Sequence, residues 1–130
     1  MTQWIRFAED GVPGFGRLDG TTISVCSGDM FGSPAPTGRT LGLDAVVVLT
    51  PTAAGKMIAL WNNFRALAAK LGNPVPSEPL YFIKGNSSYL PTGETIRTPK
   101  SYRGKVVYEG ELGIVIGRTC RGVSEAEAQR

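Results

Sequence analysis

Two glutamates, Glu109 and Glu111, are the residues of this sequence whose type and spacing best suit catalysis or metal binding. They lie in a stretch from Val106 to Gly117 whose alternating side chains predict a strand, with both carboxylates on one face and their Cα atoms about 6.6 Å apart. Two such carboxylates would repel each other, and a divalent cation held by their oxygens would remove that repulsion. A solvent-facing edge strand is the competing interpretation, because Glu-x-Glu is a common pattern.

Other chemistries are excluded or unsupported by composition. The 130 residues include no histidine, so they contain no Ser-His-Asp triad, imidazole base or histidine metal site. The two cysteines, Cys26 and Cys120, have no companion ligands at metal-binding spacing, which argues against a zinc site or a disulfide framework. Free thiols in a reducing cytosol are the simpler interpretation.

The charge pattern gives no indication of a nucleic-acid or membrane partner. Fourteen basic and eleven acidic residues give a net charge of +3, and the basic residues are spread along the chain. The densest group, Arg97 to Lys105, is typical of a solvated loop rather than a phosphate-binding surface. The longest aliphatic run, Ala45 to Leu49, is too short to cross a bilayer, and the N-terminus does not resemble a signal peptide. We therefore expect a soluble, cytoplasmic protein.

The elements that position these residues are predicted to be mainly short strands. Seventeen glycines and nine prolines favour strands and turns over a helix bundle, and 42% apolar residues are enough for a core. Asp10-Gly11 and Asp19-Gly20 are hairpin signals, so residues 2–25 should form a small antiparallel β unit in which the glycines at 11, 14, 16 and 20 serve turns. Residues 26–44 suggest a loop-dominated connection to a buried strand at Ala45 to Leu49, with a boundary near Pro51.

Three further elements are expected after that boundary. Apolar residues at helical spacing run from Met57 to Leu71, and Gly72 supplies a stop signal. Leu80 to Lys84 is a short strand candidate that ends in a turn. Ser124 and Glu127 form a capping box, which announces a helix.

From Lys56 onward the sequence resembles the fumarylacetoacetate hydrolase family, a superfamily of metal-dependent hydrolases, decarboxylases and isomerases of 2-oxo acids. The resemblance covers more than half of the chain, and it is specific because several blocks occur in the right order and spacing. The blocks are Lys56-Met57-Ile58, Trp61-Asn62-Asn63-Phe64-Arg65, Pro79 to Lys84, Ile96 to Pro99, Tyr108 to Gly117 and Val123 to Ala128. Residues 1–50 then resemble the variable N-terminal β subdomain of many members, and residues 51–130 the first part of the catalytic domain.

The resemblance implies an α+β, mainly β fold: a mixed β-sandwich roll with few short helices, usually a homodimer. It makes Glu109 and Glu111 ligands of Mg²⁺ or Mn²⁺, with a third ligand, an aspartate, beyond Arg130. The expected substrate is a small 2-oxo acid, either acylpyruvate-like or dicarboxylic, whose ketone the cation polarises during C–C hydrolysis, decarboxylation or keto-enol isomerisation. Lys84 and Asn63 are the expected substrate-binding residues, and a solvated strand end is the competing interpretation of Lys84.

The sequence departs from the family pattern, or from its own helical spacing, at three points, and each leads to a prediction. The chain ends before the third ligand, so we expect it to be the N-terminal part of a longer polypeptide and to be inactive alone, needing either the remainder or a partner. The positions of the family's catalytic histidine and glutamate are occupied by Leu67 and Lys70, which argues against hydrolysis by that dyad. The family also places a strand at 57–61 and begins the helix near Asn63, and we follow the family there. A non-catalytic scaffold or partner subunit is the alternative function.

Overall fold

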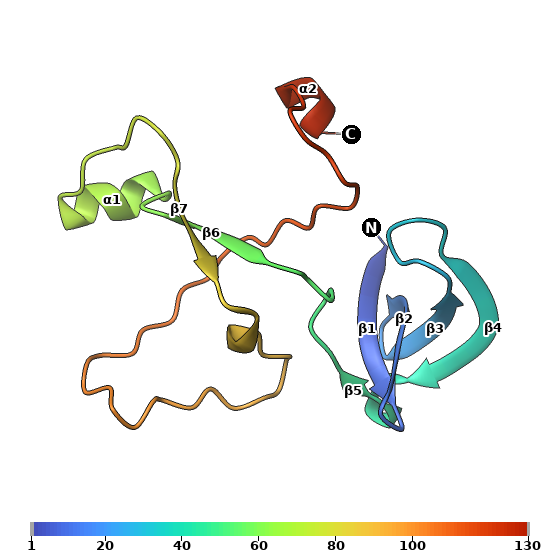
Figure 1. Ribbon diagram of the computed structural model, residues 1–130. Helices are drawn as coiled ribbons and strands as arrows, with labels where there is room; N and C mark the ends of the chain where they lie inside the picture. The colour runs from blue at the N-terminus through green and yellow to red at the C-terminus, as the bar shows by residue number, and fades with distance from the viewer. Residues whose placement is uncertain (1, 130) are drawn as a thin grey trace. The chain divides into compact units, whose positions relative to one another are not determined.

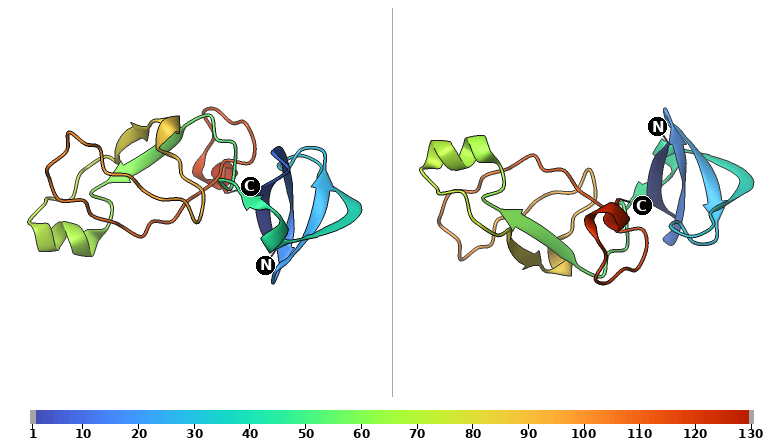
Figure 2. Two further views of the ribbon diagram at one scale, coloured as in Figure 1. Left: turned by 90° about the horizontal axis from the view of Figure 1, so that it is seen from below. Right: turned by 90° about the horizontal axis from the view of Figure 1, so that it is seen from above.

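The computed structural model describes residues 2–129 and is mainly β with few short helices, which confirms the predicted fold class (Figures 1 and 2). The chain divides into two compact units, one formed by the residues up to Thr52 together with those from Thr95 onward, the other by Ala53–Glu94. The elements are β1 (Gln3–Glu9), β2 (Val12–Asp19), β3 (Thr22–Ser27), β4 (Ala35–Gly42), η1 (Leu43–Ala45), β5 (Val47–Val48), β6 (Met57–Trp61), α1 (Arg65–Leu71), β7 (Leu80–Lys84), η2 (Asn86–Ser88) and α2 (Glu125–Ala128). None of the helices in the described part of the chain is both long and apolar enough to cross a membrane.

The first unit contains the antiparallel sheet predicted for the start of the chain. Its strand order is β4-β3-β2-β1-β5, and both predicted hairpins are present. Asp10-Gly11 is the two-residue loop between β1 and β2, whereas Asp19 is the last residue of β2 and pairs with Thr22, so the second two-residue loop is Gly20-Thr21. Asp10 and Gly11 both have positive φ, at 50° and 80°, which is the geometry of a type I′ turn. The turn chemistry therefore sets the register of the first three strands.

The side chains of these strands alternate between a buried and an exposed face, and the buried face forms the hydrophobic core. Ile5, Phe7 and Ile23 are buried, and six partly buried apolar residues pack around them: Leu18, Val25, Leu41, Leu43, Val46 and Val48. Two of the four glycines predicted in turns, Gly14 and Gly16, lie instead inside β2, opposite Phe7 and Ile5. A side chain at Gly14 would meet the Phe7 ring at 2.9 Å, so these glycines admit core side chains rather than form turns.

The expected loop at 26–44 is wrong, because it contains the eight-residue strand β4. β4 pairs with β3 across a register shift between Ser24 and Cys26, and its residues are mostly exposed, so it carries no hydrophobic alternation that sequence could reveal. The buried strand predicted at Ala45 to Leu49 shrinks to β5, which pairs only Val47 and Val48 with β1, and Val47 is exposed.

The second unit is a two-stranded antiparallel sheet, β6-β7, with α1 in the connection between the strands (Figure 1). β6 ends at Trp61 and α1 begins at Arg65. The helix predicted from apolar spacing is therefore wrong for Met57–Trp61, and the strand that the family resemblance implies at 57–61 is confirmed. The apolar residues of β6 pair with β7, and strand pairing overrides their helical spacing. Gly72 ends α1 in the left-handed conformation, as predicted.

The strand predicted from Val106 to Gly117 does not form. Between η2 and α2, residues 89–124 are all described, and they contain neither helix nor strand. A strand requires a hydrogen-bonded neighbour, and no described residue pairs with this segment, so both of its alternating faces are exposed. The capping box beyond it is present: Ser124 caps α2 and exchanges hydrogen bonds with Glu127.

Candidate functional site

Glu109 and Glu111 lie in this irregular segment, and both are exposed. Two residues of chain span at most about 7 Å, so the Cα atoms of Glu109 and Glu111 are close to each other even without a strand. Gly110 lies between them, and a Cβ added at this position would meet no atom within 4 Å. No other part of the described chain therefore packs against the segment there. The pair is thus available to a ligand but is not rigidly held by the described residues.

The donor chemistry of this pair fits a hard divalent cation, but only in part. Such a cation takes six or more oxygen ligands, and two carboxylates supply a fraction of them. Within residues 2–129 there is no group of three or more acidic, cysteine or histidine side chains placed to hold one ion. Glu109 and Glu111 are therefore suited to be part of a metal centre rather than a complete one.

Asn63 occupies the turn between β6 and α1 in the second unit and is exposed. It lines an open hollow of about 360 Å³ formed by the end of β6, the start of α1 and the chain leading into β7. Trp61, Arg65 and Glu78 are also among its lining residues, so residues with apolar surface and with both signs of charge border it. A small carboxylic acid has partners of suitable chemistry there.

Lys84, the last residue of β7, is half-buried, and its ammonium group lies 5.9 Å from the centre of the Phe82 ring. Lys84 pairs with Met57 at the start of β6, whereas Asn63 follows Trp61 at the end of β6. The backbones of the two predicted substrate-binding residues therefore lie at opposite ends of the ladder, about 13 Å or more apart. The structure does not bring them together.

Leu67 and Lys70 both lie on α1 and are exposed, with 43% of Leu67 accessible. Leu67 has no group that can transfer a proton, and Lys70 carries an amine where the family has a carboxylate. The helix that carries the acid-base pair in hydrolytic members has no such pair here.

Sequence reasoning missed Asn62, which makes the most specific polar contacts near Asn63. Asn62 is one of two non-glycine residues with positive φ among those described, at 55°. Its side-chain nitrogen donates to the Pro74 carbonyl at 2.9 Å, and its oxygen accepts from the Asn73 side chain at 3.3 Å. The available signal was the asparagine itself, since asparagine tolerates the left-handed conformation better than most residues.

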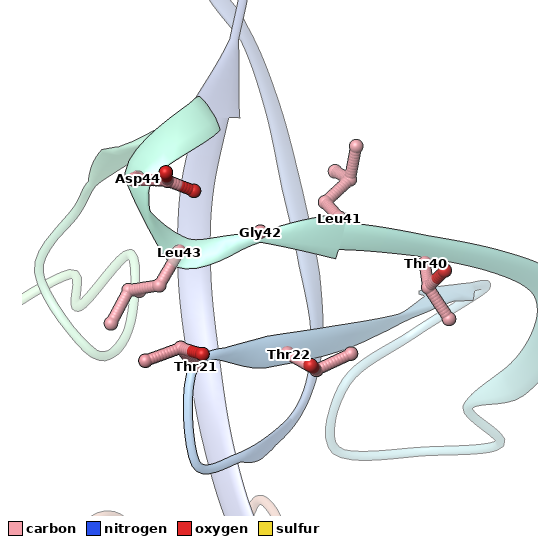
Figure 3. Close-up of a pocket in the computed structure, with 7 residues that line it drawn as sticks. All are labelled: Thr21, Thr22, Thr40, Leu41, Gly42, Leu43 and Asp44. Atoms are coloured by element: carbon pink, nitrogen blue, oxygen red, sulfur yellow. The ribbon is translucent and has the colours of Figure 1, made fainter.

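A second hollow, of about 650 Å³, lies on the first unit beside the ends of β3 and β4. Figure 3 shows the hydroxyls of Thr21, Thr22 and Thr40 and the Asp44 carboxylate spread around it and not aimed at a common point. Ligand sites combine a concave surface with convergent polar groups, and this hollow lacks the second feature.

Comparison with known proteins gives two family matches, one for each part of the chain. The family model described as fumarylacetoacetate hydrolase, C-terminal, matches residues 56–130, and the model described as Rv2993c-like, N-terminal, matches residues 2–51. The chain belongs to the fumarylacetoacetate hydrolase family, as the sequence resemblance predicted. Glu109, Glu111, Lys84 and Asn63 all lie inside the first of these matches.

Individual relatives agree with this assignment. Protein Rv2993c of Mycobacterium tuberculosis is 38% identical over 98 residues, which cover 75% of this chain and 37% of the relative. The mitochondrial oxaloacetate tautomerase FAHD1 of Arabidopsis thaliana is 42% identical over 73 residues, covering 56% and 32% of the two chains. A solved structure from Mycobacterium abscessus aligns with a TM-score of 0.54 at 34% identity over 68% of this chain and 34% of that one. This chain therefore spans about a third of the length of these relatives.

Proposed function

We propose that this chain provides part of the active site of a metal-dependent enzyme that acts on small 2-oxo acids. The observation that carries the proposal is that the Glu109-Gly110-Glu111 carboxylate pair lies inside the match to the family of hydrolases. A relative that is 42% identical over 73 residues is an oxaloacetate tautomerase, which acts on a dicarboxylic 2-oxo acid. The general reaction is therefore keto-enol or C–C chemistry next to a ketone.

In this proposal Glu109 and Glu111 hold Mg²⁺ or Mn²⁺ together with a carboxylate from outside residues 1–130. The cation, when bound, supplies a positive charge that stabilises an enolate. The described part of the chain offers two carboxylates that are exposed and at most about 7 Å apart at their Cα atoms, which supports a bridging or shared role. The protein's contribution is to bring these two negative charges to one ion.

Substrate binding is assigned first to Asn63, whose carboxamide can donate a hydrogen bond to a carboxylate in the hollow beside α1. Lys84 is proposed to bind a second carboxylate of the substrate through its positive charge, although it lies at the other end of the β6-β7 ladder. Leu67 and Lys70 supply no acid-base pair, so isomerisation or decarboxylation is favoured over hydrolysis of an acylpyruvate-like substrate.

The compartment and the partners of this enzyme are proposed from its thiols, its exposed apolar surface and its charge pattern. Cys26 and Cys120 are free thiols, and free thiols suit a reducing compartment, which supports the cytoplasm as its location. A homodimer is proposed from the family resemblance, and the exposed apolar side chains of β6 and β7 supply surface for such contacts. No nucleic-acid partner is proposed, because the basic residues form no stripe.

A second candidate is a non-catalytic family relative that acts as a scaffold or partner subunit. Two observations favour it: the dyad positions carry Leu67 and Lys70, and the described residues provide no three-ligand metal group. This candidate requires that no carboxylate from elsewhere completes the site.

The experiment that separates the two candidates uses the natural polypeptide that contains residues 1–130. Its tautomerisation and decarboxylation of oxaloacetate are measured with and without Mg²⁺ or Mn²⁺, in the wild type and in Glu109→Gln and Glu111→Gln. We expect metal-dependent turnover that falls at least a hundredfold in either variant, while Glu94→Gln, an exposed glutamate in a turn, behaves as wild type. Turnover without a metal ion, or full turnover in both variants, would contradict the proposal that Glu109 and Glu111 belong to a metal-dependent active site.

A further inference from the structure

The side chain of Asn62 joins two connections of the second unit. Asn62 is half-buried, its φ of 55° is in the left-handed region, and it immediately precedes Asn63. Its amide nitrogen donates to the Pro74 carbonyl at 2.9 Å and its oxygen accepts from the Asn73 amide at 3.3 Å. Glycine would adopt this φ more readily, but it could make neither bond. The residue type is therefore explained by the contacts and not by the backbone alone.

Asn73 is itself fixed by the end of α1. The Gly72 N–H donates to the Ala69 carbonyl at 3.2 Å and the Asn73 N–H donates to the Ala68 carbonyl at 2.9 Å, which together close the helix in a Schellman-type turn. The side-chain amides of Asn62 and Asn73 with the Pro74 carbonyl, here named the amide clamp, thus tie the start of α1 to its end.

Packing alone does not fix α1. Ala68 is its buried residue, while the large apolar side chains Phe64, Leu67 and Leu71 around it are 43–63% exposed. With little apolar surface covered, the directional bonds of the amide clamp are the contacts that define the turn between β6 and α1. Asn63 is part of that turn and lines the hollow of about 360 Å³ beside it.

We propose that Asn62 is a positioning residue: through the amide clamp it fixes the turn that presents Asn63 to a substrate carboxylate. This inference rests on the proposed substrate-binding role of Asn63. Asn62 touches no reacting atom in this account, because both of its side-chain groups are already engaged with Pro74 and Asn73. Its effect is to restrict the positions that the Asn63 carboxamide adopts, which lowers the entropy lost on binding.

The test compares variants of the natural polypeptide, labelled with ¹⁵N-asparagine. Asn62→Gly keeps the backbone conformation and removes the amide, and Asn73→Ala removes the second arm of the clamp. Asn86→Ala is the matched control, because the Asn86 amide also donates to a backbone carbonyl, that of Gly55 at 3.2 Å, and η2 follows the Lys84 end of the ladder. Two quantities are measured: the Asn63 side-chain NMR signals, and KM and kcat for oxaloacetate with Mg²⁺.

Asn62→Gly and Asn73→Ala are expected to shift and broaden the Asn63 side-chain signals and to raise KM about fivefold with kcat nearly unchanged, the effect of one weakened hydrogen bond. Asn86→Ala should lower the melting temperature comparably and leave the Asn63 side-chain signals as in wild type. In an Asn63→Ala background, Asn62→Gly should raise KM no further, because the two residues act through one contact.

Unchanged Asn63 signals in Asn62→Gly would overturn the proposal, as would KM effects that add in the double variant. If the wild type turns over no 2-oxo acid, the proposed function fails, and the NMR signals alone then decide whether the amide clamp positions Asn63. The two failures are therefore distinguishable.

Discussion

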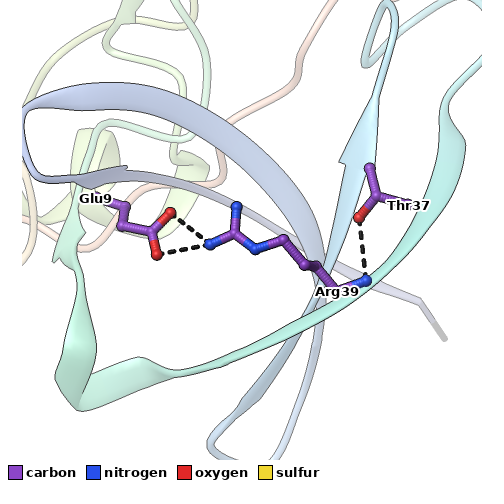
Figure 4. A network of polar contacts seen from close by, with 3 residues as sticks. All are labelled: Glu9, Thr37 and Arg39. Carbon is purple, nitrogen blue, oxygen red and sulfur yellow. Dashed lines mark hydrogen bonds and ion pairs between the residues drawn. The ribbon is translucent and has the colours of Figure 1, made fainter.

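Arg39 on β4 donates from one guanidinium nitrogen to both carboxylate oxygens of Glu9 on β1, at 2.6 and 2.7 Å (Figure 4). These strands are not neighbours, since β3 and β2 lie between them in the sheet order. The ion pair therefore spans the curled sheet from its outer strand to the end of β1. The Arg39 backbone N–H is held in turn by the Thr37 hydroxyl at 3.2 Å.

Replacing Arg39 with alanine should cost little stability despite this span. The two side chains are 56% and 33% exposed, and exposed ion pairs contribute about 0.5 kcal/mol, which salt reduces further. Thermal melting of Arg39→Ala in the natural polypeptide, at low and at high salt, should show a small loss that shrinks with salt. Arg97→Ala, an exposed arginine elsewhere, is the control. A loss of unfolding free energy above about 2 kcal/mol that does not change with salt concentration would contradict this prediction. The Arg39–Glu9 contact would then stabilise the sheet by more than a screened ion pair does.

Gly16 should be far less tolerant of alanine than Gly55. A Cβ at Gly16 would collide with the Ser24 backbone carbonyl and lie 2.9 Å from Ile23 Cγ2, whereas a Cβ at Gly55 meets nothing within 4 Å. Because the obstacle is the backbone of a neighbouring strand, Gly16→Ala should destabilise by about 1–3 kcal/mol. Gly55→Ala should change stability by less than about 1 kcal/mol. Equal melting temperatures for the two variants would contradict the close approach of β2 and β3.

The capping box of α2 predicts a pH dependence with a defined sign. The backbone N–H and the hydroxyl of Ser124 donate to Glu127 at 2.8 and 2.7 Å, and these bonds hold the pKa of Glu127 below its ordinary value. A carboxyl whose folded pKa is lowered contributes stability above its unfolded pKa and loses it as the pH falls through the folded pKa. NMR titration should show α2 fraying only in acid, and Ser124→Ala should move the Glu127 pKa upward. An unchanged Glu127 titration in Ser124→Ala would show that the Ser124 hydroxyl does not bond the Glu127 carboxylate in solution.

Residues 1–130 expressed as a separate chain should associate rather than remain monomeric. Tyr108, Leu112 and Ile114 are 81–98% exposed in a segment that pairs with no strand among residues 2–129, and such surface promotes association. Size-exclusion chromatography should give oligomers or aggregate, and about 1 mM Mg²⁺ should not raise the melting temperature, since two carboxylates bind the ion weakly. Leu112→Lys with Ile114→Lys should reduce the association. A monomer that Mg²⁺ stabilises by several degrees would show this prediction to be wrong.

The local signals in the sequence were sufficient wherever an element is determined by its own residues. Asp10-Gly11 set a hairpin, Gly72 ended α1 and Ser124 capped α2, each through a conformation or bond made within a few residues. Elements that depend on a distant neighbour were harder to predict. β4 carries no alternation because its exposed residues are held by β3 through the backbone, and Met57–Trp61 has helical spacing but pairs with β7.

The candidate site shows the same division. The carboxylate pair at Glu109 and Glu111 is visible in the sequence as two acidic residues at strand spacing, yet the strand is absent because nothing in the described chain pairs with it. Asn62 was missed because its role depends on Asn73 and Pro74, which lie eleven and twelve residues away in the sequence and meet it only after α1 folds.

Isothermal titration of the natural polypeptide with Mn²⁺ measures whether Glu109 and Glu111 bind a metal ion. We expect one Mn²⁺ per chain in the wild type and in the Glu94→Gln control. Glu109→Gln and Glu111→Gln should each weaken binding at least tenfold, because each removes one charged oxygen ligand from the ion. Binding as tight as wild type in both glutamine variants would contradict the account, since the carboxylate pair would then not be part of the metal centre.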